Sequence, residues 1–257
     1  MLRTSLAVSL ALIFAAPACT SKPTVDPVVQ AEELKRDLSN GAQRVKDEKY
    51  AEAEAMFARV LAAEPENAQA LAGMGRVRLG TKKYDEALSL LERAAQKLPD
   101  DPELQASLGE AYSKLDRQPE AATAYAAAFK ALPGHGDYGL RQAQALRKSK
   151  QLEQAEAILR EVAKSDAQTE FVYTELGDVL REEGKLDDAL KAYMTALIEH
   201  PGDKSAHAGA AEIYALQGNR GKAIDEWSTY IRMDCCSEFS NNVAKKRIAE
   251  LQQGRAG

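Results

Sequence analysis

The feature that most constrains the fold of this chain is a repeat with a period of 34 residues. When the sequence is aligned with itself at that spacing, six ungapped copies follow one another without interruption. Their bounds are 34–67, 68–101, 102–135, 136–169, 170–203 and 204–237. One copy of this length cannot bury its own hydrophobic face, so neighbouring copies must stack into an elongated array with a continuous core.

Four columns of the alignment keep the same kind of residue in nearly every copy. The twentieth column is always alanine: Ala53, Ala87, Ala121, Ala155, Ala189 and Ala223. The eighth column is always small: Gly41, Gly75, Gly109, Ala143, Gly177 and Ala211. The twenty-fourth column is always large and apolar: Phe57, Leu91, Tyr125, Leu159, Tyr193 and Trp227. The thirty-second column is mostly proline, which ends a helix because it disfavours the helical conformation of the preceding residue.

These columns closely resemble the tetratricopeptide-repeat pattern L-G…A-x₃-F…P, and the resemblance covers residues 34–237. It implies that each copy is a pair of antiparallel helices. The predicted fold is an all-α, right-handed superhelical solenoid of six repeats with a concave groove. The segment 238–257 is predicted to form a capping helix and a tail, with Val243, Ile248 and Leu251 on one side of the helix.

The first eighteen residues indicate an export signal. Arg3 precedes an apolar run over residues 6–15, which is too short to span a bilayer and typical of a signal peptide. The Ala-Pro-Ala sequence at 16–18 fits cleavage before Cys19, either in a plain secretory protein or in a lipoprotein. A cysteine directly after the cleavage point favours lipidation, and the segment resembles the lipobox of bacterial lipoproteins. We therefore expect a signal peptide over 1–18, and a lipidated Cys19 with a tether over 19–33.

The lipoprotein resemblance also implies a location. Thr20 stands where many lipoproteins of the inner membrane carry aspartate. The expected location is therefore the outer membrane, with the acyl chains of Cys19 in the lipid and the repeats facing the periplasm.

Composition and motifs exclude several other function classes. Lys and Arg number 34 against 39 Asp and Glu, and a net charge of −5 does not favour binding to nucleic acid. The three histidines leave little for a histidine-rich metal site. A G-x-G-x-x-G sequence over 134–139 follows Pro133 at a junction between helices, so it indicates a loop and not a dinucleotide site. We expect no enzymatic activity, no metal, no cofactor and no small-molecule substrate.

The adjacent pair Cys235 and Cys236 leaves three alternatives open. The chain has three cysteines, and if Cys19 is acylated, two thiols remain in an oxidising compartment. Adjacent Cα atoms lie about 3.8 Å apart, which is short for a disulfide, so a bond between Cys235 and Cys236 would be strained. The alternatives to that bond are two free thiols or a bond to another chain.

The concave groove is the expected binding surface, because proteins with such repeats generally hold a peptide there. The positions that usually line the groove come from the first helix of each repeat. In the first two repeats they provide an apolar floor with basic edges, suited to an amphipathic helix. We expect the partner to contact Leu38, Ala42, Val45, Arg76 and Leu79.

The layout of a lipobox, a short tether and six repeats resembles the pilotins of type IV pilus secretins. The resemblance implies a protein that binds secretin subunits at the outer membrane and promotes assembly of the ring through which pili pass. Pilus-dependent motility would depend on it. The alternative is a lipoprotein adaptor that brings periplasmic proteases or cell-wall hydrolases to their substrates.

Overall fold

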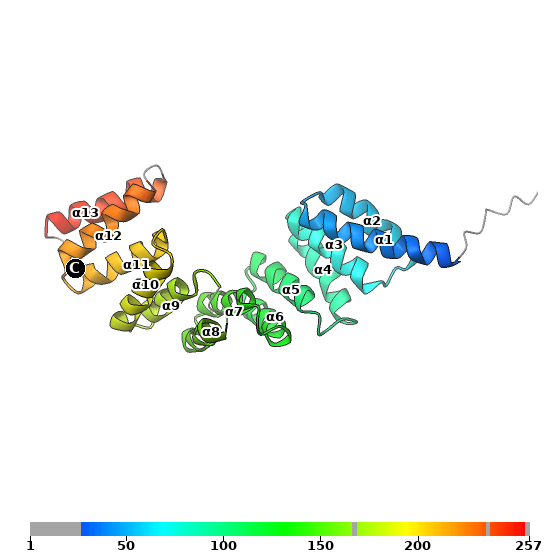
Figure 1. Cartoon of the computed structure of the whole chain (residues 1–257), viewed down its shortest axis with the longest axis horizontal. Coiled ribbons are helices and arrows are strands. Elements are labelled where there is room, and N and C mark those ends of the chain that lie inside the picture. Colours follow the sequence, from blue (N-terminus) through cyan, green and yellow to red (C-terminus); the bar gives the residue numbers. More distant parts are fainter. Residues whose placement is uncertain (1–26, 166–168, 235–236, 255–257) are drawn as a thin grey trace, which may run out of the picture.

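The computed structural model describes residues 27–165, 169–234 and 237–254, and in these ranges it contains helices and no strand. The helices form antiparallel pairs, stacked into a curved array (Figure 1). Their bounds are α1 Pro27–Lys46, α2 Tyr50–Ala63, α3 Ala68–Gly80, α4 Tyr84–Ala95, α5 Pro102–Lys114, α6 Gln118–Ala131, α7 Gly136–Lys148, α8 Leu152–Ser165, α9 Val172–Glu182, α10 Leu186–Glu199, α11 Lys204–Leu216, α12 Arg220–Met233, the π-helical turn η1 Ser240–Ala244, and α13 Lys245–Gln252. The predicted all-α solenoid of paired helices is confirmed.

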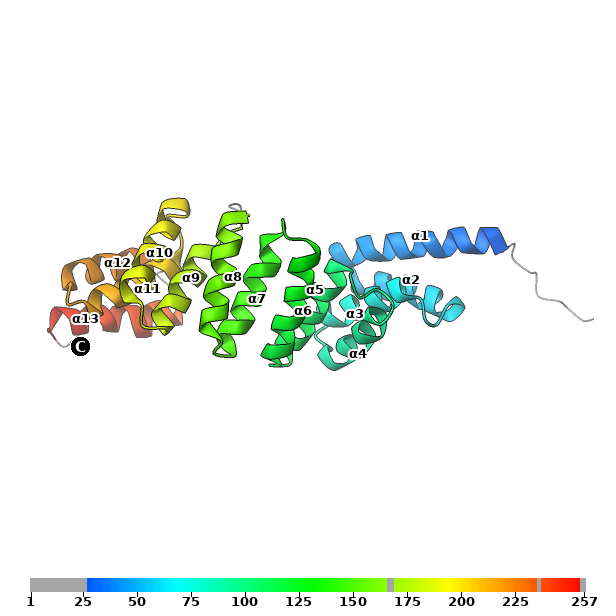
Figure 2. The same cartoon turned by 90° about the horizontal axis from the view of Figure 1, so that it is seen from below.

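Helix α1 begins earlier than expected. It starts at Pro27, so the predicted tether over 19–33 is wrong for residues 27–33, which are helical. Proline is favoured in the first turn of a helix, and Gln30 to Glu33 are good helix formers. Figure 2 shows that α1 extends beyond the rest of the array. The other N-terminal predictions, the signal peptide over 1–18, Cys19 and the rest of the tether, lie outside the described residues.

The conserved columns mark the places where the two helices of a repeat touch. All six alanines of the twentieth column are 0% exposed. A Cβ atom added at Gly41 would lie 2.8 Å from the ring of Phe57, and one added at Gly177 would lie 2.5 Å from the ring of Tyr193. A small residue in the first helix therefore makes room for a large residue in the second helix of the same repeat.

The large residue of the twenty-fourth column also joins one repeat to the next. A Cβ atom at Gly73, in the second repeat, would overlap the ring of Phe57 from the first. A Cβ atom at Gly209, in the sixth repeat, would overlap the ring of Tyr193 from the fifth. These rings are buried between two repeats and make the core continuous across the junction.

The turn between the two helices of each repeat contains one residue in the left-handed conformation, always at the fifteenth position of the repeat. In the last two repeats this residue is Gly184 or Gly218, with φ of 80° and 76°. The other four are Glu48, Lys82, Asp116 and Lys150, with φ between 57° and 62°. A side chain in this conformation costs about 1–2 kcal/mol, so the first four turns are strained and are held by the packing of the helices on either side.

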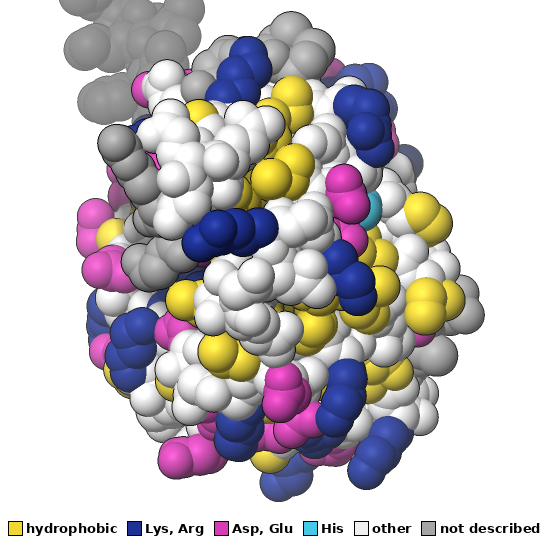
Figure 3. Space-filling view, turned by 90° about the vertical axis from the view of Figure 1, so that its left-hand side faces the viewer, with side chains coloured by type: hydrophobic (Ala, Val, Ile, Leu, Met, Phe, Trp, Pro, Cys, Tyr) yellow, Lys and Arg dark blue, Asp and Glu magenta, His cyan; other side chains and the backbone are white. Residues whose placement is uncertain are grey.

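The C-terminal end is covered by η1 and α13, as the predicted cap requires. Leu251 is buried, and Ile248 packs against the core at its edge. Phe239 precedes η1 and contacts the rings of Trp227 and Tyr230, at centroid distances of 6.3 and 5.4 Å. Seen from this end, hydrophobic side chains are interspersed with charged ones of both signs (Figure 3). Cys235 and Cys236 lie outside the described residues.

Replacing Ala121 with Leu is expected to lower the free energy of unfolding by about 1–3 kcal/mol, because three added carbon atoms overfill a fully buried helix contact. Denaturant unfolding followed by circular dichroism measures the change. Ala131→Leu is the matched control, since Ala131 lies exposed at the end of the same helix α6. Equal stability of the two variants would mean that the twentieth column is not a close contact.

Candidate functional site

The first helices of successive repeats lie against one another along one side of the array. Contacts join α1 to α3, α3 to α5, α7 to α9, and α9 to α11. In a curved stack, helices on the inner side lie closer to one another than helices on the outer side do. The side formed by the first helices of the repeats is therefore the concave side. The first helices of the repeats are therefore positioned to receive a partner.

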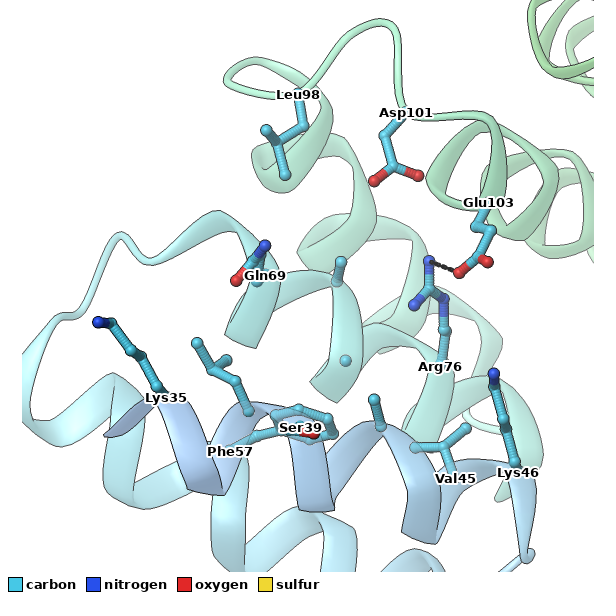
Figure 4. Close-up of a pocket in the computed structure, with 14 residues that line it drawn as sticks. Lys35, Ser39, Val45, Lys46, Phe57, Gln69, Arg76, Leu98, Asp101 and Glu103 are labelled. Atoms are coloured by element: carbon cyan, nitrogen blue, oxygen red, sulfur yellow. Dashed lines mark ion pairs between the residues drawn. The ribbon is translucent and has the colours of Figure 1, made fainter. Parts of the chain in front are cut away.

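An elongated cavity of about 480 Å³ lies between α1 and α3 (Figure 4). Its wall on the α1 side carries Leu38, Ala42 and Val45. The opposite wall comes from α3 and from the connection between α4 and α5. The cavity is mainly apolar at its base and charged at its rim, which is the usual character of a binding site for a ligand of moderate size.

Four of the five predicted groove residues line this cavity, namely Leu38, Ala42, Val45 and Arg76. Leu79 does not line it. Leu79 is 9% exposed and packs in the core with Leu71 and Leu88, among others. The reason is the position of α3, which packs against α1 and α2 on one side and against α4 and α5 on the other.

The floor of the cavity includes Phe57, a residue of the twenty-fourth column that was not among the predicted groove residues. Its ring is 1% exposed and lies between Gly41 and Gly73. Because neither glycine has a side chain, the cavity reaches the edge of the ring. The signal in the sequence was the second glycine, since Gly73 precedes the conserved small residue Gly75 by two positions and belongs to no conserved column.

The rim on the α1 side is basic. Lys35 and Lys46 stand at its two ends (Figure 4). Lys35 pairs with Glu32 at 3.0 Å, but both side chains are more than two-thirds exposed, so this pair contributes little. Lys46 forms no ion pair within the described part of the chain. The α1 side therefore offers two ammonium groups to a ligand.

The rim on the opposite side is acidic and is anchored by its own hydrogen bonds. Asp101 caps the start of α5 by accepting a hydrogen bond from the backbone N–H of Leu104 at 2.8 Å. Glu103 lies 3.7 Å from Arg76, whose Nε also donates a hydrogen bond to Ser107 at 3.1 Å. Arg76 is thus held by the chain itself and is less available to a ligand than its place in the sequence suggests.

A second group of charged residues lies where α7 meets α9. Arg147 pairs with Glu175 at 2.5 Å and with Glu182 at 2.9 Å, and Lys150 pairs with Glu182 at 2.8 Å. Burial raises the pKa of Glu175, although Arg147 acts in the opposite direction. Burial would also raise the pKa of Glu182, but hydrogen bonds from Lys150 and Arg147 outweigh it and lower that pKa. These ion pairs join the fourth repeat to the fifth.

Replacing Glu175 with Gln is expected to remove one contribution to stability that decreases as pH rises. The raised pKa means that the folded chain binds this proton more tightly than the unfolded chain does. The contribution of Glu175 to the free energy of unfolding therefore falls as pH rises above the ordinary value of 4.5 through the folded pKa. Denaturant unfolding between about pH 4 and 7 measures this, with the exposed Glu161→Gln as control. Parallel curves for wild type and Glu175→Gln would contradict the assignment.

The described residues contain no group of three or more His, Cys, Asp or Glu side chains that could hold a metal ion. None of the described helices is long and apolar enough to cross a bilayer. What the described geometry provides is an apolar cavity with a basic rim and an acidic rim. This arrangement is suited to holding a ligand.

Comparisons with protein-family models match two regions of the chain. A tetratricopeptide-repeat model matches residues 44–111 and 78–128, and a second tetratricopeptide-repeat model matches 174–232. Together the matched regions make up more than half of the chain. No protein with a curated description matches the sequence.

Several solved structures share the fold. YrrB, described as a TPR protein with an unusual peptide-binding site, is 21% identical over 74% of this chain and 97% of its own, with a TM-score of 0.60. PilF of Pseudomonas aeruginosa is 14% identical over 88% of this chain and 99% of its own, with a TM-score of 0.69. A tetratricopeptide repeat protein from Parabacteroides merdae is 15% identical over 87% of this chain and 88% of its own, also at 0.69. At these identities the likeness shows the fold.

Proposed function

Because the chain belongs to the tetratricopeptide-repeat family, we propose that it is a binding protein that holds a segment of another protein in the cavity between α1 and α3. The observation that carries this proposal is the cavity itself, with Phe57 at its floor and Leu38, Ala42 and Val45 along one wall. Proteins of this family bind protein partners, and the peptide-binding site of YrrB supports a peptide as the ligand.

The partner that we propose is a subunit of the type IV pilus secretin, so that the protein acts as a pilotin. Support comes from the order of the segments, a stretch that resembles a lipobox before Cys19, then a short linker and six repeats. The fold shared with PilF over almost the full length of both chains is compatible with the same role. The protein then acts at the outer membrane, where it promotes assembly of the secretin ring.

Lipidation of Cys19 gives this role its location, and Cys19→Ser is expected to release the protein from membranes or to block its processing. Without the sulfur atom of Cys19, the thioether-linked acyl chains cannot be attached. Metabolic labelling with palmitate is expected to mark the wild type and not the variant. Equal labelling of both would remove the lipoprotein proposal.

The secretin itself provides the test of the pilotin proposal. A strain that lacks this protein is expected to lose the heat-resistant secretin multimers seen on gels, while the secretin monomer remains. Cys19→Ser and a groove variant, Leu38→Glu, are expected to give the same loss. Cys19→Ser removes the attachment to the membrane. Leu38→Glu places a charge where an apolar part of the partner must be buried. Intact multimers in the deletion strain would contradict the pilotin proposal and favour the alternative, an adaptor for proteases or cell-wall hydrolases.

A further inference from the structure

The residues of α1 that line the cavity have the spacing of the contact face of a helix in a helical bundle. Lys35, Leu38, Ala42 and Val45 follow one another at intervals of three, four and three residues. Intervals of three and four place side chains along one stripe of a helix, and this is the spacing by which one helix packs lengthwise on another.

Helix α3 presents a second stripe of the same kind to the same cavity. Gln69, Ala72 and Arg76 follow one another at intervals of three and four residues, and all three line the cavity. The cavity is therefore bordered by two helices whose stripes face a common space. A third helix lying in that space would complete a bundle of three.

The small residues between the two stripes set how closely such a helix can approach. Ala42 is exposed within the cavity, and Ala72 and Gly73 lie on the facing side. An apolar side chain on the third helix could reach past them to the ring of Phe57. The apolar floor thus selects a helix with its own stripe of large apolar residues.

The charged residues at the rim of the cavity determine which residues of the bound helix can flank its apolar stripe. Lys35 and Lys46 lie eleven residues apart on α1, which is three helical turns or about 16 Å. Both are on the α1 side of the cavity, whereas Asp101 and Glu103 are on the other. A helix in the cavity would meet two lysines on one flank, and on the other it would meet Asp101 together with Glu103, which already pairs with Arg76.

We propose that the ligand is an amphipathic helix of at least three turns that lies along α1, with an apolar stripe against Phe57 and acidic residues on the flank that faces Lys35 and Lys46. This inference rests on the proposed function and specifies the chemistry of the partner. It gives the bound helix a definite orientation, because reversing its charged flanks would set like charges against each other on both sides.

Two synthetic helical peptides of equal length test this inference. Both carry the same apolar stripe, and at two flanking positions eleven residues apart one has Glu and the other has Lys. Each is labelled and titrated with the full-length protein in detergent, and fluorescence anisotropy gives the dissociation constant. We expect the Glu peptide to bind about tenfold more tightly at low salt, with the difference shrinking as salt screens the exposed charges.

Variants of the protein then assign the preference to residues. Lys35→Glu combined with Lys46→Glu is expected to reverse the order of the two peptides. Lys130→Glu combined with Lys164→Glu is the matched control, because both of these lysines are exposed and neither lines the cavity. The control is expected to keep the preference for the Glu peptide.

The outcomes separate this inference from the proposed function. Equal binding of both peptides, lost in Ala42→Trp, would overturn the charge preference and leave the groove as the binding site. Binding that Ala42→Trp does not change would overturn both, since the peptide would then lie elsewhere. Failure of both peptides to bind would overturn the helical ligand, and the secretin multimers would still decide the proposed function on their own.

Discussion

Tyr193→Ala is expected to lower the free energy of unfolding by about 3–5 kcal/mol, the range for removing a large buried aromatic side chain. Tyr193 is 0% exposed, and its ring packs on Gly177 in its own repeat and on Gly209 in the next. Both glycines would face a void, because a glycine has no side chain with which to fill it. Denaturant unfolding followed by circular dichroism measures the loss.

Tyr193→Phe is the matched control, since it keeps the ring and removes only the hydroxyl group. That hydroxyl donates a hydrogen bond to Asp178 at 2.6 Å, and its loss is expected to cost about 1–2 kcal/mol. The difference between the two variants isolates the packing of the ring between the repeats. Equal losses in both would mean that the packing of the ring between the fifth and sixth repeats adds nothing to the stability beyond the hydrogen bond within the fifth repeat.

Ala42→Trp is expected to weaken partner binding by on the order of 100-fold while the chain stays folded. Ala42 is exposed, so an indole ring at this position enters the cavity between α1 and α3 and does not overfill the core. It occupies the space that an apolar side chain of the partner would need. Binding of a purified secretin segment, measured by calorimetry, gives the change in affinity.

The control for this variant is Ala131→Trp, which adds the same side chain to an exposed position outside the cavity. Circular dichroism is expected to show the same helical content for wild type and both variants. If Ala131→Trp weakened binding as much as Ala42→Trp, the loss would come from the added indole in general, and the cavity would not be the binding site.

The repeat architecture was predictable because the contact residues recur at a fixed period. The column of Ala53 is buried in every repeat, and the Gly41 column meets the Phe57 column wherever glycine occurs. The turns were not predictable in the same way. Their left-handed position holds Gly184 and Gly218 in only two repeats, and four charged residues adopt the same conformation under the constraint of the helices around them.

The site was predictable in part. Leu38 and Val45 line the cavity, as their positions in the first helix of a repeat predict. The same reasoning failed for Leu79, because a helix inside the array has neighbours on both sides and buries the corresponding position. Column position alone does not distinguish a terminal repeat from an internal one. The ion pair between Arg76 and Glu103 was also not predictable, because it depends on the distance between two repeats.

The most direct test of the central claim is to identify what occupies the cavity in living cells. A photo-crosslinking amino acid placed at position 42 faces the space between α1 and α3, and one placed at position 130 faces solvent outside it. After irradiation, position 42 is expected to yield an adduct with a secretin subunit that mass spectrometry identifies, and position 130 is expected to yield none. An adduct at position 42 with a protease or wall hydrolase, or equal adducts at both positions, would contradict the account.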